Sequence, residues 1–315
     1  MTEIAIALGG GGIRGIAHIG ALQRLEEEGY QIRAIAGTSA GGIVGAVYAA
    51  GYSPSEICEL IKNADHNNLF LRNPNDGPSL MGLKGLSEIL MKAVGNRQFD
   101  DLNIPFACTA VDIVSSQEVI LSQGYVVEAL LATSAFPGIF PPREVGDAIL
   151  GDAILVDGGV LDPVPVALAH YLLPDLPVVA ICLSPSAEGW SQINPLKMPE
   201  KSPIPRPLLE QFARLRLTQA FNIFAKSMDI TSRMMTELRL NIDQPDVLIR
   251  PDVTRFGLID DVDPNELVKI GDEAVRDAMD EIRQSFSLKN TITRRFKKRY
   301  LPGKVLPIEN GFNES

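Results

Sequence analysis

The chain has 315 residues, of which 45% are hydrophobic and 22% are charged, an ordinary balance for a globular protein. Its formal charge of −10 argues against nucleic-acid binding, which depends on a basic surface. Length and composition together indicate one large α/β domain with appendages rather than two equal domains.

Three cysteines, Cys58, Cys108 and Cys182, lie in apolar or helical surroundings and at no metal-like spacing, which predicts free thiols in a reducing compartment. The first residues carry no basic segment, their apolar run is too short for a signal sequence, and no run approaches a membrane-spanning length. We therefore expect a cytoplasmic protein, at most peripheral on the inner face of the membrane.

The first 50 residues alternate between buried strands and helices. An apolar run over residues 4–8 predicts a strand, glycines interrupt it, and apolar residues three apart from Ile16 to Leu25 predict one face of a helix. A second strand over 32–36 and a second helix over 42–50 follow. This order implies a parallel sheet, so both glycine-rich turns lie at its carboxyl edge, where α/β folds bind ligands.

Further elements follow in order. Ser53 and Glu56 form a capping-box pattern before a helix that ends near residue 62, and residues 65–83, rich in Asn, Pro and Gly, predict a loop. The remaining pattern predicts a fixed proline-rich loop over 134–142, helices over 85–94, 125–133 and 163–172, and strands over 104–111, 118–121, 152–156 and 178–183.

The composition changes after residue 183. A proline-rich loop over 184–207, a long helix over 208–240, a last strand over 247–253 and a last helix over 264–286 are predicted. The long helix carries Met228, Met234 and Met235; it either covers the core, which we favour, or forms a flexible rim for an acyl chain. These shifts suggest a core over 1–183, a helical, lid-like extension over 184–288 and a basic tail over 289–315.

The first glycine-rich turn reads GGGIRG over residues 10–15, a G-x-G-x-x-G pattern between a strand and a helix. A dinucleotide site would need an acid at the end of the second strand, which is absent, and a phosphate-binding loop would need a Gly-Lys-Ser/Thr sequence, also absent. The alternative is an oxyanion hole, in which backbone N–H groups at a helix N-terminus stabilise a developing negative oxygen. We prefer it because it also accounts for the second turn.

The second turn reads GTSAG over residues 37–41, a G-x-S-x-G pattern that exposes a strained nucleophile, here Ser39, at the end of a strand. A serine needs a base, yet none of the three histidines is expected at this edge. We interpret His18 as a packing residue of the first helix, His66 as a solvated loop residue and His170 as lying late in its own helix.

A carboxylate is the better candidate for the base. Asp157 ends an apolar strand and precedes Gly158 and Gly159, a sequence that also suits a simple Asp-Gly turn. Three other aspartates compete with it: Asp112, Asp152 and Asp162. The last of these precedes Pro163 and is better interpreted as a helix N-cap.

Taken in order, GGGIRG over 10–15, GTSAG over 37–41 and DGG over 157–159 resemble the three signatures of the patatin-like phospholipase family. The segments PGIFPP over 137–142 and PVP over 163–165 look like it as well. The resemblance covers residues 4–183. It implies a three-layer α/β/α fold with a mainly parallel central sheet and a lipid acyl hydrolase that needs no metal or cofactor.

The resemblance also implies a Ser–Asp dyad, with Ser39 as nucleophile and Asp157 as base. It makes Gly10, Gly11 and Gly12 the source of oxyanion N–H groups. The remaining motif residues support these parts: Arg14, Gly15, Gly37, Gly41, Gly158 and Gly159. An ordinary Asp is a poor base at neutral pH, so burial must raise its pKa. Arg14 either pairs with an anionic group of the substrate or anchors its loop to an acid, and we favour anchoring.

Two other functions stay open: an esterase or thioesterase acting on other acyl donors, and a non-catalytic lipid-binding regulatory protein. The predicted partner is a lipid or acyl ester. Residues 289–304 carry many cations and no acid, so the tail is either a solvated helix or a peripheral contact with anionic phospholipid.

Overall fold

The computed structural model describes residues 2–64, 68–74, 76–147, 151–186, 216–296 and 300–308. Within these residues a central sheet has the strand order β5-β6-β3-β2-β1-β7-β8, with β4 pairing to β3 and β9 pairing to β4. The pairs of β1 with β2 and β7, of β2 with β3, and of β7 with β8 are parallel. The predicted α/β fold with a mainly parallel sheet is thus confirmed.

The first four predicted elements are all present. Strand β1 (Thr2–Leu8) leads through a short 3₁₀ helix, η1 (Gly12–Ile16), into α1 (Ala17–Glu27); β2 (Tyr30–Gly37) then leads into α2 (Ala40–Ala49). The ends of the two strands lie side by side, with Leu8 paired to Gly37. Both glycine-rich turns therefore leave the sheet at the same edge, as expected.

The middle of the chain adds an antiparallel part to the sheet. Helix α3 (Pro54–Lys62) has the predicted capping box of Ser53 and Glu56, and α4 (Lys84–Ala93), η2 (Phe99–Asp101) and α5 (Val126–Thr133) complete the helices. Strands β3 (Phe106–Asp112) and β4 (Gln117–Leu121) form one antiparallel pair, and β5 (Arg143–Asp147) and β6 (Gly151–Asp157) form another. The sequence prediction missed β5, whose residues do not alternate between apolar and polar.

The second half contributes to the same sheet. After η3 (Gly158–Val160), α6 (Val166–Leu172) and β7 (Val178–Ile181), the helix α8 (Arg216–Asp243) leads to β8 (Val247–Ile249), which pairs with β7. The predicted last helix is in fact two, α9 (Pro264–Asp277) and α10 (Met279–Ser285). It is also not the last, because α11 (Leu288–Phe296) and β9 (Lys304–Val305) follow.

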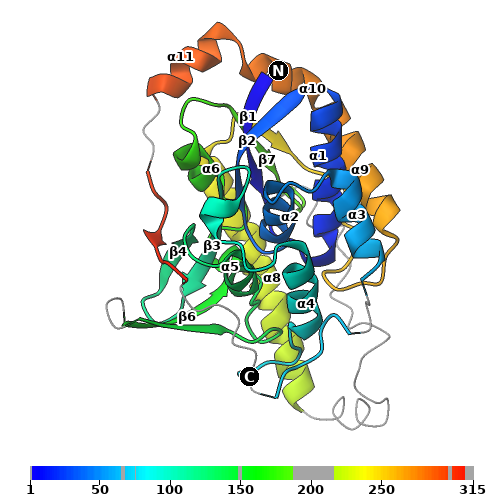
Figure 1. Cartoon of the computed structure of the whole chain (residues 1–315), viewed down its shortest axis with the longest axis vertical. Coiled ribbons are helices and arrows are strands. Elements are labelled where there is room, and N and C mark those ends of the chain that lie inside the picture. Colours follow the sequence, from blue (N-terminus) through cyan, green and yellow to red (C-terminus); the bar gives the residue numbers. More distant parts are fainter. Residues whose placement is uncertain are drawn as a thin grey trace.

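Helices cover both faces of the sheet, as the three-layer prediction requires (Figure 1). One face of β1 carries the larger side chains Ile4, Ile6 and Leu8, which pack in the same cluster as residues of α1, α2, α5 and α9. The opposite face carries Ala5 and Ala7 and packs against α6 and the end of α8. Both faces are buried, which is why the strands read as continuous apolar runs. No helix in the described part of the chain is long and apolar enough to span a membrane.

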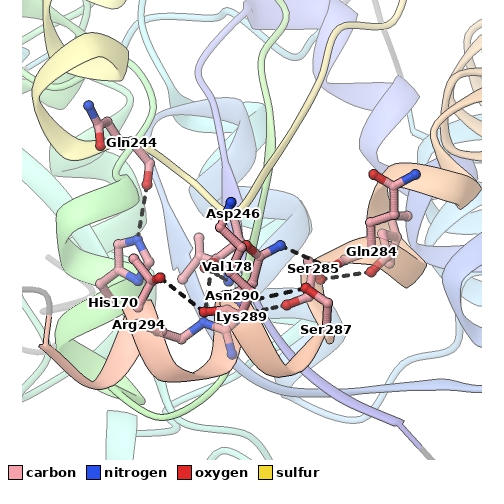
Figure 2. A network of polar contacts seen from close by, with 12 residues as sticks. His170, Val178, Gln244, Asp246, Gln284, Ser285, Ser287, Lys289, Asn290 and Arg294 are labelled. Atoms are coloured by element: carbon pink, nitrogen blue, oxygen red, sulfur yellow. Dashed lines mark hydrogen bonds and ion pairs between the residues drawn. The ribbon is translucent and has the colours of Figure 1, made fainter.

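The basic segment after residue 288 is not a free tail. Its Arg294 is 5% exposed, and its guanidinium donates to Asp246 Oδ1 (3.0 Å) and to the Ser285 carbonyl (2.8 Å), as Figure 2 shows. The other carboxylate oxygen of Asp246 accepts the N–H of Val178, the first residue of β7. Farther on, Leu306 and Ile308 are buried beside β4. Residues 297–299 lie outside the described residues.

We expect Arg294→Met to lower the free energy of unfolding by about 1–3 kcal/mol, because it leaves the Asp246 carboxylate without its cationic partner. The matched control is Arg283→Met, since Arg283 pairs with Asp280 at the surface with 62% of its side chain exposed, and such pairs contribute less than about 1 kcal/mol. Chemical denaturation of both variants measures the difference. Equal effects would show that the buried pair is no more stabilising than the surface one.

Candidate active site

Two strands that run toward each other bring the predicted nucleophile and base together. Strand β2 runs parallel to β3 up to the pair Gly37–Cys108, and there it stops. Strand β6 pairs with β3 in the antiparallel direction, beginning two residues beyond Cys108. The last residue of β6, Asp157, lies beside Ala110. The ends of β2 and β6 therefore meet along one side of β3, and the turns that carry Ser39 and Asp157 become neighbours.

Ser39 occupies a strained turn at the start of α2. Its φ of 53° and ψ of −123° lie where non-glycine residues are uncommon, at a typical cost of about 1–3 kcal/mol. Its N–H donates to Thr133 Oγ1 (2.9 Å), which holds the turn in place. The turn also packs closely against the end of β1. A Cβ at Gly41 would lie 2.1 Å from the carbonyl oxygen of Leu8, so only glycine fits there.

Asp157 is 3% exposed, and its Oδ1 accepts the N–H of Gly159 at 2.7 Å. Burial raises the pKa of this carboxyl to about 6, while hydrogen bonds from the Ser39 side chain and the Gly159 amide act in the lowering direction. A carboxylate with this pKa is ionised at neutral pH and is a far better proton acceptor than an ordinary surface Asp.

Two amides of the glycine loop have no backbone partner in the described part of the chain. The N–H of Gly10 donates to the Pro163 carbonyl (2.9 Å), and that of Ile13 donates to the Leu258 carbonyl (2.8 Å). Between them, the amides of Gly11 and Gly12 donate to no backbone carbonyl of the described residues. The expectation that Gly10 also supplies an oxyanion N–H is therefore corrected, because that donor is already used. Gly12 has φ +58°, and a Cβ there would lie 2.2 Å from the Leu258 oxygen.

The other motif glycines allow the turns to pack closely. A Cβ at Gly15 would lie 2.5 Å from that of Ala40, which joins the glycine loop to the nucleophile turn. At Gly37 a Cβ would lie 2.5 Å from the Cα of Gly42, and at Gly158 it would lie 2.2 Å from Thr109 Oγ1. These residues are spacers rather than reacting groups.

Ser39, Asp157 and the glycine loop all line one cavity of about 1070 Å³. Away from these groups its wall is apolar and comes mainly from α2, α3 and α4, with side chains that include Val47, Ile57, Leu60, Leu86, Leu90 and Phe140. Helix α8 contributes Asp229, Ser232 and Arg233 to the lining. The methionines considered as a rim for an acyl chain, Met228, Met234 and Met235, are not among the lining residues.

Arg14 also lines the cavity. Its Nε atom is buried and has no hydrogen-bond partner among the described residues. Burial lowers the pKa of its guanidinium, while Asp229 and Asp260 act in the opposite direction. The anchoring ion pair that we favoured from the sequence is not found within the described part of the chain.

Sequence reasoning missed the residues that hold the two turns. Thr133 Oγ1 donates to the Thr109 carbonyl (2.6 Å), and Thr38 Oγ1, which lies 2.8 Å from Thr109 Oγ1, donates to the Asp162 carbonyl (2.9 Å). These threonines come from the turn after β2, from β3 and from α5, so no local pattern marks them. Asp162 is not the predicted N-cap, a position that Pro165 takes; its carboxylate pairs instead with Arg239 of α8 at 2.8 Å.

None of the rival residues that the structure describes lines the cavity with Ser39. His18 and His170 are both buried, and His66 lies outside the described residues. Asp112 accepts the N–H groups of Val114 and Ser115 in its own turn, and Asp152 is exposed on β6. The three cysteines are free and buried, as predicted, and no group of metal-binding side chains is found among the described residues.

The chain is similar to several known proteins. An uncharacterized NTE family protein of Mycobacterium tuberculosis is 36% identical over 190 residues, which cover 59% of this chain and 51% of that protein. Lysophospholipase NTE1 of Saccharomyces cerevisiae is 33% identical over 168 residues, 52% of this chain and 10% of that protein. The crystal structure of VipD from Legionella pneumophila aligns with a TM-score of 0.48 and 14% identity, over 89% of this chain and 66% of that chain.

The chain thus spans about half the length of its mycobacterial relative and a tenth of the yeast one. The profile of the family described as "Patatin-like phospholipase" matches residues 6–170, just over half of the chain. That segment contains the glycine loop, the turn of Ser39 and the end of β6 at Asp157. The chain belongs to the patatin-like phospholipase family.

Proposed function

We propose that this protein is a serine lipid acyl hydrolase that cleaves carboxylic esters of phospholipids or lysophospholipids through an acyl-Ser39 intermediate. The observation that carries the proposal is the position of Ser39 and the buried Asp157 in the wall of one large apolar cavity. The similarity to a yeast lysophospholipase supports the same class of substrate.

In the first step, Ser39 Oγ attacks the carbonyl carbon of the ester, and Asp157 accepts the hydroxyl proton. The carbonyl oxygen becomes an oxyanion, which the amides of Gly11 and Gly12 stabilise because neither donates to a backbone carbonyl of the described residues. The tetrahedral intermediate collapses, the bond to the alcohol oxygen breaks, and Asp157 returns its proton to the leaving alcohol.

In the second step, water attacks the acyl ester of Ser39 while Asp157 takes a proton from it. The same two amides hold the second oxyanion, and the fatty acid leaves as Ser39 recovers its hydrogen. No histidine is needed, because the buried carboxyl has a pKa of about 6 and Ser39 is already within hydrogen-bonding reach of it.

The apolar wall formed by α2, α3 and α4 suits an acyl chain, and Arg14 offers a positive charge to an anionic group of the substrate. Other esters or thioesters fit the same chemistry, and they form the second candidate class. A non-catalytic lipid-binding role is the third. The strain at Ser39 disfavours it, because a protein that only binds lipid gains nothing from a strained serine.

We also propose that the basic segment contacts anionic phospholipid at a membrane surface. Arg294 is unavailable for this contact because it is buried against Asp246. The proposal therefore rests on Lys289, which is exposed, and on the cations of residues 297–299, which precede the exposed Tyr300. Each cation near an anionic surface contributes roughly 1 kcal/mol.

Ser39→Ala should abolish hydrolysis of a phospholipid ester, and Asp157→Asn should lower kcat by about 10²–10⁴-fold, because the first removes the nucleophile and the second its base. Asp152→Asn is the matched control, since this residue lies on the same strand but is exposed. Rates are measured on a panel of phospholipids, lysophospholipids, acylglycerols and acyl thioesters. Wild-type rates for Asp157→Asn would remove Asp157 from the mechanism.

A fluorophosphonate probe separates an enzyme from a lipid-binding protein. We expect it to label the wild-type protein but not Ser39→Ala.

The rate should also depend on pH. Asp157 must be ionised to accept a proton, and burial raises its pKa to about 6, so kcat/KM should fall as the pH drops through about 6 and reach a plateau above it. A soluble ester assayed from pH 5 to 8 gives the profile, and Asp152→Asn should leave its midpoint unchanged. A flat profile over this range would contradict the assignment of Asp157 as the base.

The membrane contact is tested by replacing Lys297, Lys298 and Arg299 with glutamine and measuring co-sedimentation with vesicles. Truncation is unsuitable, because Leu306 and Ile308 are buried and would be lost. We expect the triple variant to bind phosphatidylserine-containing vesicles several-fold more weakly and to match wild type on pure phosphatidylcholine. The control replaces Lys269, Arg276 and Arg283, exposed cations of α9 and α10. If both triple variants lost vesicle binding equally, the weaker binding would reflect net charge alone and would contradict a specific contact by the basic segment.

A further inference from the structure

His18 is a buried histidine beside the active site that the proposed mechanism does not use. It is the second residue of α1, just after the glycine loop and η1, and its side chain is fully buried. Its Nε2 atom lies 2.7 Å from the carbonyl oxygen of Gly9, the residue that precedes the loop amides. This contact is short and enclosed, and it joins the ring to the backbone rather than to a substrate.

The contact determines the tautomer of the ring. A carbonyl oxygen only accepts hydrogen bonds, so the proton must be on Nε2. Burial lowers the pKa of His18 to about 4, which leaves the ring neutral at neutral pH, with Nδ1 unprotonated. Nδ1 is buried as well and has no hydrogen-bond partner among the described residues.

The peptide group between Gly9 and Gly10 makes a hydrogen bond at each end. The carbonyl of Gly9 and the N–H of Gly10 belong to one planar unit. The carbonyl accepts from His18, and the N–H donates to the Pro163 carbonyl at 2.9 Å. Farther along, the N–H of Ile13 is held by the Leu258 carbonyl. The amides of Gly11 and Gly12 thus lie between two fixed points in a chain of glycines that would otherwise be free to rotate.

We propose that His18 is a positioning residue for the oxyanion loop: by donating Nε2–H to the Gly9 carbonyl, it fixes the Gly9–Gly10 peptide plane and so directs the Gly11 and Gly12 amides at the reacting carbonyl. This inference rests on the proposed hydrolase function. It adds to it a residue that touches neither the substrate nor Ser39 and acts only through the backbone of the loop.

An apolar side chain would fill the same space without burying an unpartnered nitrogen. His18 instead leaves Nδ1 unsatisfied, which burial normally disfavours. The contact to Gly9 is the one hydrogen bond of the ring found among the described residues, so it is what distinguishes His18 from a packing residue. His170 provides a comparison. It is equally a buried helix residue, and its Nε2 lies 3.5 Å from a carbonyl oxygen, that of Gln244 (Figure 2). This carbonyl lies outside the glycine loop, and His170 comes from α6, which packs on the opposite face of the sheet from α1.

The test uses His18→Met, which keeps an apolar volume but has no donor, and His18→Gln, whose amide nitrogen replaces Nε2. His170→Met is the control. For each folded variant, kcat and KM are measured on a soluble p-nitrophenyl ester, together with the Ki of a trifluoromethyl ketone, which forms an oxyanion on Ser39. Thermal melting reports stability separately.

We expect His18→Met to lower kcat by about 10–100-fold and to weaken the ketone in parallel, with KM nearly unchanged, because misplaced donors act on the oxyanion and not on ground-state binding. His18→Gln should recover most of kcat, and His170→Met should keep it. Wild-type kcat in folded His18→Met, or a His18→Gln variant no better than His18→Met, overturns the proposal.

One measurement needs no variant. Nitrogen NMR of the wild-type protein should show the His18 proton on Nε2, and a proton on Nδ1 overturns the proposal even if no substitution at His18 folds. Ser39→Ala, assayed alongside, keeps the two hypotheses apart. Hydrolysis that survives Ser39→Ala means that the proposed function has failed. Loss of hydrolysis in Ser39→Ala combined with full activity in His18→Met means that only this inference has failed.

Discussion

The meeting of β2 and β6 along one side of β3 is the constraint on which the site depends. Strand β2 ends at Gly37, and β6 runs toward it from the opposite direction along the same side of β3. The turns that follow the two strands are therefore neighbours. A purely parallel sheet would send both turns away from the same edge, side by side. Here they face each other, so Ser39 and the buried Asp157 line the same cavity. The antiparallel pairing of β6 with β3 is therefore what places Asp157 beside the turn of Ser39.

Burial shifts the pKa values of Asp157 and His18, two titratable groups near the loop, in opposite directions. It penalises the charged form of each, so the pKa of Asp157 rises to about 6 while that of His18 falls to about 4. The carboxyl becomes a base suited to neutral pH. The imidazole remains neutral and keeps one N–H to donate. A single physical effect thus brings the pKa of the carboxyl closer to neutral pH and moves the pKa of the imidazole away from it.

Much of the fold could be predicted from sequence where the signal is local. The strands up to Gly37, the capping box at Ser53 and the turn of Ser39 follow from short patterns. What failed depended on partners distant in sequence. The use of the Gly10 amide depends on Pro163, and the role of Asp162 depends on Arg239, 77 residues later. Strand β9 has only two residues and exists because it pairs with β4. The sequence predicted Arg294 to be one cation of a basic tail, because no residue near it in sequence indicates that it pairs with Asp246.

The segment that matches the family profile does not complete the site on its own. The guanidinium of Arg239 lies 2.8 Å from Asp162 and 3.3 Å from Glu118, two buried carboxyls whose pKa values burial raises. Asp162 ends the turn that begins at Asp157, and its backbone carbonyl accepts from Thr38, next to the nucleophile. Without the cation from α8, Asp162 and Glu118 would lack their compensating charge. Helix α9 packs just as closely, since a Cβ at Gly20 would lie 1.8 Å from the Val268 carbonyl oxygen. The residues after 170 thus belong to the structural support of the two turns, although Ser39, Asp157 and the glycine loop all lie before them.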